Sequence, residues 1–252
     1  MRLLTLARDL RRRKSREKQS LFVAEGVRSV EELLRSSLRI QGILTAPQLD
    51  GAPRGTALRA AIAEKGIETT AVTEQEFRSA AETESPQGVL AIAEIPDRKL
   101  ATLAGRESLR VLVLDAVQDP GNVGTILRTA AALGADAVVA LPGTVDIWNA
   151  KVIRGAMGAS FHHLCMHASL AELIEFLDSE QVALWAAEAS GVSVTDAVPP
   201  GKLALAVGNE GAGLSSSVRE RATQTVSLPI SASVESLNVA VAAGILLYQL
   251  RK

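Results

Sequence analysis

From residue 111 onward, short continuously apolar runs alternate with helical patterns, and this alternation restricts the possible folds more than any other feature. Strands are predicted at 111–114, 137–141, 161–166, 182–187 and 203–207. Helices are predicted at 123–133, 149–157, 169–178 and 214–222. A strand that is apolar on both faces must be covered on both faces. We therefore predict an α/β fold in which helices cover a parallel sheet.

A smaller α/β pattern precedes this region. It contains predicted strands at 21–24, 40–44, 67–72 and 87–94 and predicted helices at 27–35, 58–65 and 74–80. Residues 8–20 are predicted to be helical or partly disordered. A charge-rich connector follows. We therefore predict a small domain at residues 1–97, a linker at 98–108 and a larger domain at 109–252.

The charge of the chain is unevenly distributed. The net charge is −1, yet residues 1–20 contain eight basic residues against Asp9 and Glu17, a local +6 that leaves −7 for the rest. A basic segment on an acidic body is typical of a protein that binds a phosphate backbone. A solvated, frayed N-terminus is the alternative. The residues predicted to contact RNA are Arg11, Arg12, Arg13, Lys14, Arg16 and Lys18.

The cysteine content and the length of the apolar runs indicate the cellular compartment of the protein, and the histidine and cysteine spacing indicates whether it binds a metal. Cys165 is the single cysteine, which fits a reducing cytoplasm. The longest apolar run, 239–248, is too short to cross a bilayer, and the first residues lack a signal-peptide core. We therefore predict a soluble, cytoplasmic protein. In the run from Phe161 to His167, read as a strand, His163, Cys165 and His167 would share one face, but no fourth ligand is evident, so we predict no metal.

Three loops are candidates for chemistry, because ligands of open parallel sheets bind beyond the carboxyl ends of the strands. The first loop follows the strand at 111–114 and leads into a helix. Asn122 lies near the start of this helix. Arg128 is predicted on its apolar face, beside residues such as Leu127 and Ala130. A buried arginine needs a partner, although the side chain could also reach the surface.

The second loop, 203–214, is rich in glycine. Gly208, Gly211 and Gly213 would let the backbone approach a ligand closely, with Asn209 and Glu210 between them. The spacing is G-x-x-G-x-G, which differs from the dinucleotide-binding pattern, and no suitably placed ribose-binding acid follows it. A nicotinamide-dependent oxidoreductase is therefore excluded.

The third loop connects an apolar run to the terminal helix. Pro229 ends the run, and the loop brings Ser236 and Asn238 to the N-terminus of the helix, where unpaired amides and the positive end of the helix dipole collect. These two polar side chains would form the wall of a pocket. The alternative is an N-cap serine followed by an asparagine with no role.

Taken together, these loops resemble the SpoU (TrmH-like) branch of the SPOUT superfamily of RNA methyltransferases. Its three motifs are similar to Asp119-Pro-Gly-Asn-Val-Gly-Thr-Ile-Leu-Arg-Thr129, to Val207-Gly-Asn-Glu-Gly-Ala-Gly213, and to Leu228-Pro-Ile230 with Ser236-Leu-Asn-Val239. The resemblance covers residues 109–252. Weaker similarity at 20–28 and 85–89 resembles the small RNA-binding domain that often precedes the methyltransferase domain.

The resemblance implies a parallel-sheet domain with a deep trefoil knot, a homodimer with catalytic groups contributed across the interface, and methyl transfer from S-adenosylmethionine (AdoMet) to a ribose 2′-hydroxyl in RNA. Carried over by motif position, the catalytic residues are Asn122, Arg128, Glu210, Ser236 and Asn238. The cofactor-binding residues are Gly208, Asn209, Gly211, Leu228, Ile230 and Leu237.

Two questions about function stay open from the sequence. The basic N-terminal segment favours ribosomal RNA over transfer RNA as the substrate. A non-catalytic RNA-binding or ribosome-assembly factor that keeps the fold is the alternative to an enzyme. The presence of Arg128, Glu210, Ser236 and Asn238 argues against such a factor, since it would have no chemical need for them.

Overall fold

The computed structural model describes residues 2–231, 233–234 and 236–251, so the outermost residues of the two predicted domains lie outside the described part. The chain divides into two compact units. Unit 1 contains residues 1–97 and 148–162, and unit 2 contains residues 98–147 and 163–252. The assignment of 148–162 to unit 1 is not indicated by the sequence pattern. The domain limits drawn from the sequence stay a prediction.

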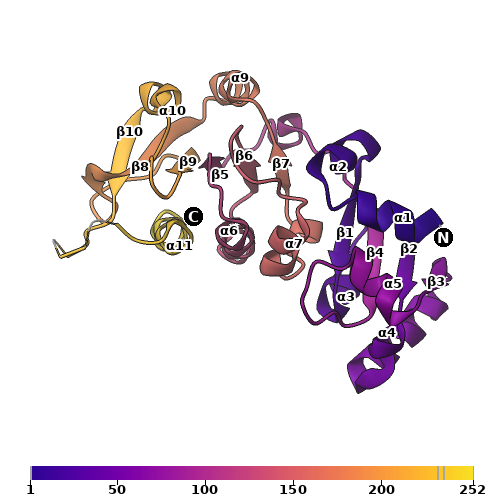
Figure 1. The fold of residues 1–252 in the computed structure, drawn as a ribbon. Coiled ribbons are helices and arrows are strands. Elements are labelled where there is room, and N and C mark those ends of the chain that lie inside the picture. Colours follow the sequence, from indigo (N-terminus) through magenta and orange to yellow (C-terminus); the bar gives the residue numbers. More distant parts are fainter. Residues whose placement is uncertain (1, 232, 235, 252) are drawn as a thin grey trace. The chain divides into compact units, whose positions relative to one another are not determined.

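Unit 1 is built on a mixed four-stranded sheet of order β1-β4-β2-β3 (Figure 1). Its strands are β1 (Leu21–Glu25), β2 (Ile40–Thr45), β3 (Thr69–Ala71) and β4 (Val89–Glu94). Strand β4 pairs antiparallel with both β1 and β2, and β3 pairs parallel with β2. The helices are α1 (Arg2–Asp9), α2 (Arg13–Gln19), α3 (Val27–Arg35), η1 (Pro47–Gly51), α4 (Pro53–Glu64), α5 (Glu74–Ala80), α7 (Ala150–Ala156) and α8 (Ala159–His162).

An aromatic cluster explains why residues 148–162 belong to unit 1. Phe22 on β1 is fully buried, and the centroid of its ring lies 4.8 Å from that of Trp148 and 5.7 Å from that of Phe161. These large side chains remove much apolar surface from water. Arg154 on α7 also forms an ion pair with the buried Glu25 at the end of β1. Segment 148–162 therefore completes the core of unit 1.

Unit 2 contains a six-stranded sheet of order β10-β8-β9-β5-β6-β7, in which all pairs are parallel. Its strands are β5 (Leu109–Asp115), β6 (Ala137–Ala140), β7 (Cys165–His167), β8 (Ala183–Ser193), β9 (Lys202–Gly208) and β10 (Gln224–Ser227). Its helices are η2 (Leu100–Leu103), α6 (Pro120–Ala132), α9 (Leu170–Glu180), α10 (Ser216–Arg221) and α11 (Val239–Gln249). The predicted α/β class and parallel sheet are confirmed.

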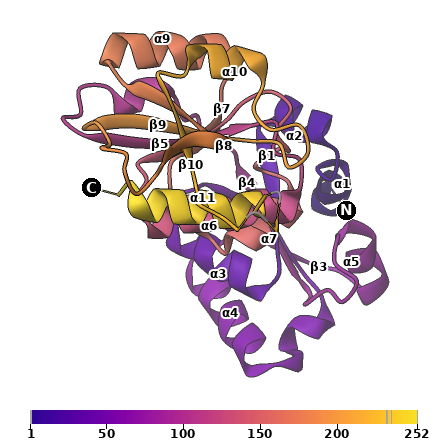
Figure 2. The same ribbon diagram turned by 90° about the vertical axis from the view of Figure 1, so that its left-hand side faces the viewer.

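Helices cover both faces of this sheet. Figures 1 and 2 show α9 and α10 on one face and α6 and α11 on the other. Every residue of the central strand β5 is buried, as a parallel strand between two helical layers requires. The loops that follow the neighbouring strands β5 and β9 leave the sheet at the same edge. These are two of the three loops singled out from the sequence.

One local prediction is wrong. The strand predicted at 161–166 is divided between the short helix α8 and strand β7, so His163 lies outside the strand and does not share a strand face with Cys165 and His167. The first residue of the predicted strand, Phe161, is instead a buried residue of helix α8 in unit 1.

The described residues contain neither a helix that could cross a membrane nor a cluster of side chains that could bind a metal ion. None of the helices there is both long and apolar enough to cross a membrane. The part of the chain that the structure describes holds no group of three or more His, Cys, Asp or Glu side chains arranged to bind a metal ion. The absence of a metal, like the trefoil knot, stays a prediction.

Candidate active site

The loop after β9 makes an unusually close backbone contact with itself. A Cβ on Gly208 would lie 2.3 Å from the carbonyl carbon of Gly213, so only glycine fits there. Asn209 and Gly213 exchange two backbone hydrogen bonds of 2.9 Å. The Asn209 side-chain oxygen also accepts hydrogen bonds from the amides of Gly211 and Ala212. The glycines and Asn209 therefore fold the chain into a tight, internally bonded turn.

Two residues at the end of β5 attach this turn to the sheet. The buried carboxylate of Asp115 accepts a 2.6 Å hydrogen bond from the amide of Ser215. The next residue, Ala116, has a positive φ of 57°, and its carbonyl oxygen accepts a 3.0 Å hydrogen bond from the Asn209 side chain. A non-glycine residue in this conformation is strained, which is common where a backbone group must face a functional site. Sequence reasoning missed both residues.

The third loop ends at Asn238, which is the N-cap of α11. Its side-chain oxygen accepts hydrogen bonds from the amides of Ala240 and Val241, and the helix begins at Val239. Ser236 precedes the helix and does not cap it. The alternative of a serine cap followed by an asparagine with no role is therefore wrong.

A chain of side-chain hydrogen bonds connects the three loops. Asn238 donates its amide to the side-chain oxygen of Asn122 at 2.9 Å. Asn122 donates its own amide to Glu210 at 2.8 Å. Asn122 itself is fixed at the start of α6, where its backbone amide donates to the N-cap Asp119. One predicted catalytic residue from each motif therefore takes part in this chain, with Asn122 in the middle.

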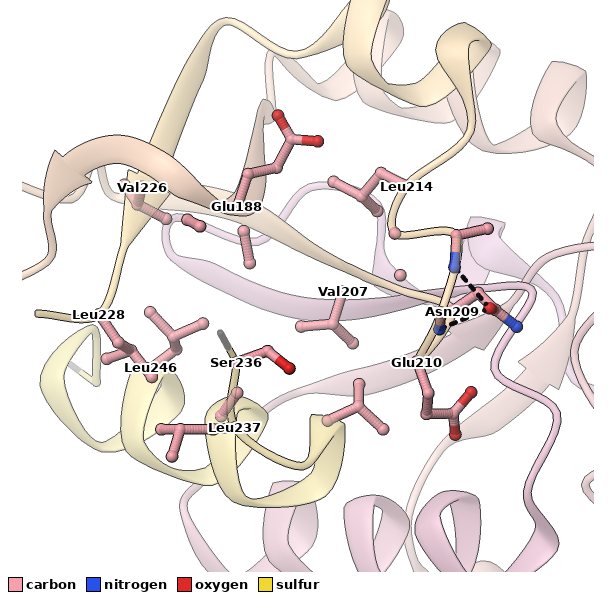
Figure 3. A pocket seen from close by; sticks show the side chains of 18 of the residues that line it. Glu188, Val207, Asn209, Glu210, Leu214, Val226, Leu228, Ser236, Leu237 and Leu246 are labelled. Carbon is pink, nitrogen blue, oxygen red and sulfur yellow. Dashed lines mark hydrogen bonds between the residues drawn. The ribbon is translucent and has the colours of Figure 1, made fainter. Parts of the chain in front are cut away.

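The second and third loops, together with residues of β8, α10 and α11, line a cleft of about 600 Å³. Figure 3 shows Leu228, Leu237 and Leu246 on the α11 side of the cleft and Glu188 with Leu214 on the opposite side. All six predicted cofactor-binding residues and two of the predicted catalytic residues line it: Gly208, Asn209, Gly211, Leu228, Ile230, Leu237, Glu210 and Ser236. The volume is within the range usual for a small-molecule site.

Arg128 does not line this cleft. Its side chain is exposed, whereas Ile126, Leu127 and Ala130 are buried, so the prediction that Arg128 shares their apolar face is wrong. Successive helix positions turn by about 100°, which separates residue 128 from its neighbours. Arg128 instead borders a shallow groove of about 370 Å³ between α6 and α11. No described residue forms an ion pair or hydrogen bond with its guanidinium.

One ion pair in the cleft wall was also missed from the sequence. Glu188 on β8 and Arg219 on α10 both line the cleft, and their Oε1 and Nε atoms are 2.5 Å apart. A Cβ at Gly213 would lie 3.2 Å from the Arg219 guanidinium, so the pair lies against the glycine-rich turn. The predicted strand ended at residue 187, and a search one residue beyond its carboxyl end would have found Glu188.

The basic segment belongs to unit 1. Arg11, Arg12, Arg13, Lys14 and Lys18 are exposed on or near α2. Arg12 and Arg13 form surface ion pairs with Asp9 and Glu17. Arg16 differs, because it is 3% exposed and donates to the carbonyls of Leu10 and Arg11. Its guanidinium holds the α1–α2 turn, so it is a structural residue and not a surface contact for RNA.

This chain is similar to known proteins in both sequence and fold. The profile of the SpoU rRNA Methylase family matches residues 109–248, more than half of the chain. The chain belongs to the SpoU rRNA methylase family. A second profile, the MRM3-like substrate binding domain, matches residues 5–91. The resemblance drawn from the three motifs is confirmed.

Relatives of this SpoU-family chain extend over nearly its whole length. The 23S rRNA (guanosine(2553)-2'-O)-methyltransferase RlmP of Bacillus subtilis (strain 168) is 38% identical over 97% of this chain and 94% of that protein. The AdoMet-bound rRNA methyltransferase from Sinorhizobium meliloti has a TM-score of 0.85 at 28% identity, covering 98% and 93% of the two chains. AviRb from Streptomyces viridochromogenes, solved with AdoMet, has a TM-score of 0.89 at 25% identity, covering 98% and 96%.

Proposed function

We propose that this chain transfers the methyl group of AdoMet to the 2′-hydroxyl of a ribose in 23S ribosomal RNA. The observation that carries the proposal is the hydrogen-bonded chain Asn238–Asn122–Glu210 beside a cleft lined by the glycine-rich turn. Family membership and a full-length relative named as a 23S rRNA 2'-O-methyltransferase support the choice of reaction and substrate.

The cleft suits AdoMet in shape and chemistry. A Cβ at Gly208 would collide with the backbone of Gly213, so glycine at this position permits the tight turn whose backbone lines the cleft. Leu228, Leu237 and Leu246 offer apolar surface to an adenine ring. The backbone of the turn and of residues 228–230 would hold the nucleoside. When bound, AdoMet supplies an electrophilic methyl group on a sulfonium.

The polar residues have distinct roles in this proposal. Glu210, oriented by Asn122, positions the ribose, and Ser236 with Asn238 orients the 2′-hydroxyl toward the methyl carbon. Arg128 binds the phosphate of the target nucleotide and stabilises developing negative charge on the hydroxyl oxygen. Arginine remains protonated in proteins, which makes it a poor proton acceptor.

We propose further that two chains form a homodimer through α6 and α11. Helix α11 has three large exposed residues: Val241 (51% exposed), Ile245 (40%) and Tyr248 (49%). Ile245 and Tyr248 border the groove beside Arg128. Apolar side chains on one helix face favour burial against a second surface. The dimer would bring Arg128 of one chain to the cleft of the other, since it does not line its own.

The proposal also assigns a role to unit 1. Unit 1 would bind RNA through the exposed basic residues of the α2 region, namely Arg11, Arg12, Arg13, Lys14 and Lys18. The substrate-binding profile at residues 5–91 supports this role. The proposal also includes a knotted C-terminal chain, a site without a metal and a cytoplasmic location. The buried reduced thiol of Cys165 is compatible with the cytoplasmic location.

A methylation assay tests the proposed function directly. Purified protein, AdoMet and undermethylated 23S rRNA are incubated, and 2′-O-methylated positions are mapped by mass spectrometry. We expect one new site, and the nucleotide equivalent to that of the RlmP relative is the first to inspect. Transfer RNA serves as the control substrate. Methylation of transfer RNA alone, or of no RNA, contradicts the proposal.

The alternative is a non-catalytic RNA-binding or assembly factor. Calorimetric titration with AdoMet separates the two, because an adaptor has no need for the cofactor. We expect binding in the micromolar range, about −8 kcal/mol. Absence of AdoMet binding together with retained RNA binding would favour the adaptor.

A further inference from the structure

The wall of the cleft contains an ion pair, Glu188–Arg219, that the methyl-transfer assignment does not use. Among the described residues that line the cleft, the charged side chains are Glu188, Glu210 and Arg219. Glu188 extends from β8 toward α10, away from Ser236 (Figure 3), and pairs there with Arg219. The two carboxylates and one guanidinium give these lining residues a formal charge of −1.

The ligands of the proposed reaction differ in charge. AdoMet carries an ammonium, a carboxylate and a sulfonium, a net +1. The product, S-adenosylhomocysteine (AdoHcy), has lost the sulfonium charge with the methyl group and is neutral. The net −1 that these three side chains contribute therefore favours AdoMet over AdoHcy. The cleft must release AdoHcy after each turnover, so this difference affects product release.

We propose that the net charge of Glu188, Arg219 and Glu210 sets the preference of the site for AdoMet over AdoHcy, with Arg219 neutralising one of the two carboxylates. This inference rests on the proposed function. The pair is 24% and 46% exposed at its two side chains, so each charge acts through partly aqueous surroundings. Arg219 also lies against Gly213, so the pair positions the glycine-rich turn. A change in the position of the turn affects both ligands alike, whereas a change in net charge affects the cationic AdoMet more than the neutral AdoHcy.

Single substitutions of Glu188 and Arg219 should change the ratio of the AdoHcy and AdoMet dissociation constants in opposite directions. Glu188→Gln leaves Arg219 unpaired and raises the cleft charge to zero, which lowers the AdoMet preference. Arg219→Gln leaves Glu188 unpaired and lowers the cleft charge to −2, which raises the preference. A unit charge on a partly exposed side chain in the wall of the cleft changes the ratio of these dissociation constants by roughly two- to fivefold. A purely structural role predicts no such opposite signs.

The experiment is calorimetric titration of AdoMet and AdoHcy into the full chain and its variants at low salt and at about 0.5 M salt. The matched control is Arg221→Gln, which breaks a second ion pair of α10, with Asp178, whose residues do not line the cleft. The exchanged variant Glu188→Arg/Arg219→Glu restores the net charge. We expect opposite shifts for the two single variants, a wild-type ratio for the control and the exchanged pair, and smaller shifts at high salt.

Two results overturn the inference. If the wild type binds both ligands and the two single variants keep its ratio, or shift it in the same direction, the charge balance does not set the preference. The proposed function then stands. If the wild type binds neither ligand, the proposed function fails and this inference fails with it. Thermal unfolding of each variant, measured without ligand, verifies that the chains are folded.

Discussion

At the scale of single residues, Gly208 has the least tolerance for change. Gly208→Ala would place a Cβ against the backbone of Gly213, so we expect a loss of about 1 to 3 kcal/mol in unfolding free energy and at least about tenfold weaker AdoMet binding. Gly211→Ala is the matched control for the loss of stability, because its Cβ would meet only Asn209 at 3.7 Å. Chemical denaturation and calorimetry measure both effects. Equal behaviour of the two variants would contradict the close-contact argument.

Arg128 is exposed and outside the cleft, so its removal should separate catalysis from cofactor binding. We expect Arg128→Ala to lower the methylation rate by on the order of 10² to 10³, while the dissociation constant for AdoMet changes by less than about twofold. Single-turnover methylation and calorimetry measure the two quantities. Loss of AdoMet binding in this variant would refute the role given to Arg128.

His163 should make stability depend on pH. Burial, with a smaller effect from the Arg98 cation, lowers the pKa of His163 below its ordinary value of 6.5, and no described residue accepts or donates a hydrogen bond at its buried Nε2. As pH falls below about 6.5, the unfolded chain binds a proton that the folded chain resists, so folded stability decreases.

His163→Gln should therefore reduce the fall in stability between neutral and mildly acidic pH. Urea denaturation at several pH values measures this. His162→Gln, at a side chain that is 46% exposed, is the control for removal of a neighbouring surface histidine. Identical pH profiles for His163→Gln and the wild type would show that this histidine is not responsible.

At the scale of elements, the α6–α11 face gives a prediction about assembly. Ile245→Asp places a charge in the middle of the proposed interface, which should weaken dimerisation by at least about tenfold, or 1.4 kcal/mol. Sedimentation velocity over a range of concentrations measures this. Val198→Asp, at a side chain that is 87% exposed and outside the groove, should leave assembly unchanged. A wild-type chain that is monomeric at all concentrations contradicts the proposed dimer.

The elements themselves were largely predictable from the sequence. Helices α3 and α5 begin and end at the predicted residues, and the predicted strands of the parallel sheet are present except the one at 161–166. Periodicity identifies an element because it reflects which side chains that element buries. It failed at 161–166 because Phe161 is buried by Phe22, a residue far away in the sequence. Local pattern carries no information about such a partner.

At the scale of the whole molecule, the allocation of residues 148–162 to unit 1 can be tested. Phe161 is 2% exposed and stacks on Phe22, so Phe161→Ala should cost about 3 to 5 kcal/mol of stability. Hydrogen exchange measured by mass spectrometry should show lost protection in β1 and β4, with β5 and β9 unchanged. Lost protection in β5 and β9 instead would place residues 148–162 with the parallel sheet.

The sequence by itself determined the α/β class, the three loops and, through the family resemblance, eight of the residues that line the cleft. It could do so because strand ends, glycine spacing and proline are local features, and parallel strands bring their carboxyl ends to one edge. Only the tertiary structure decided that Asn238, Asn122 and Glu210 bond in series, that Arg128 lies outside the cleft, that Arg16 is buried, and that Glu188 pairs with Arg219. Each of these depends on the distance between side chains or on burial, and packing sets both.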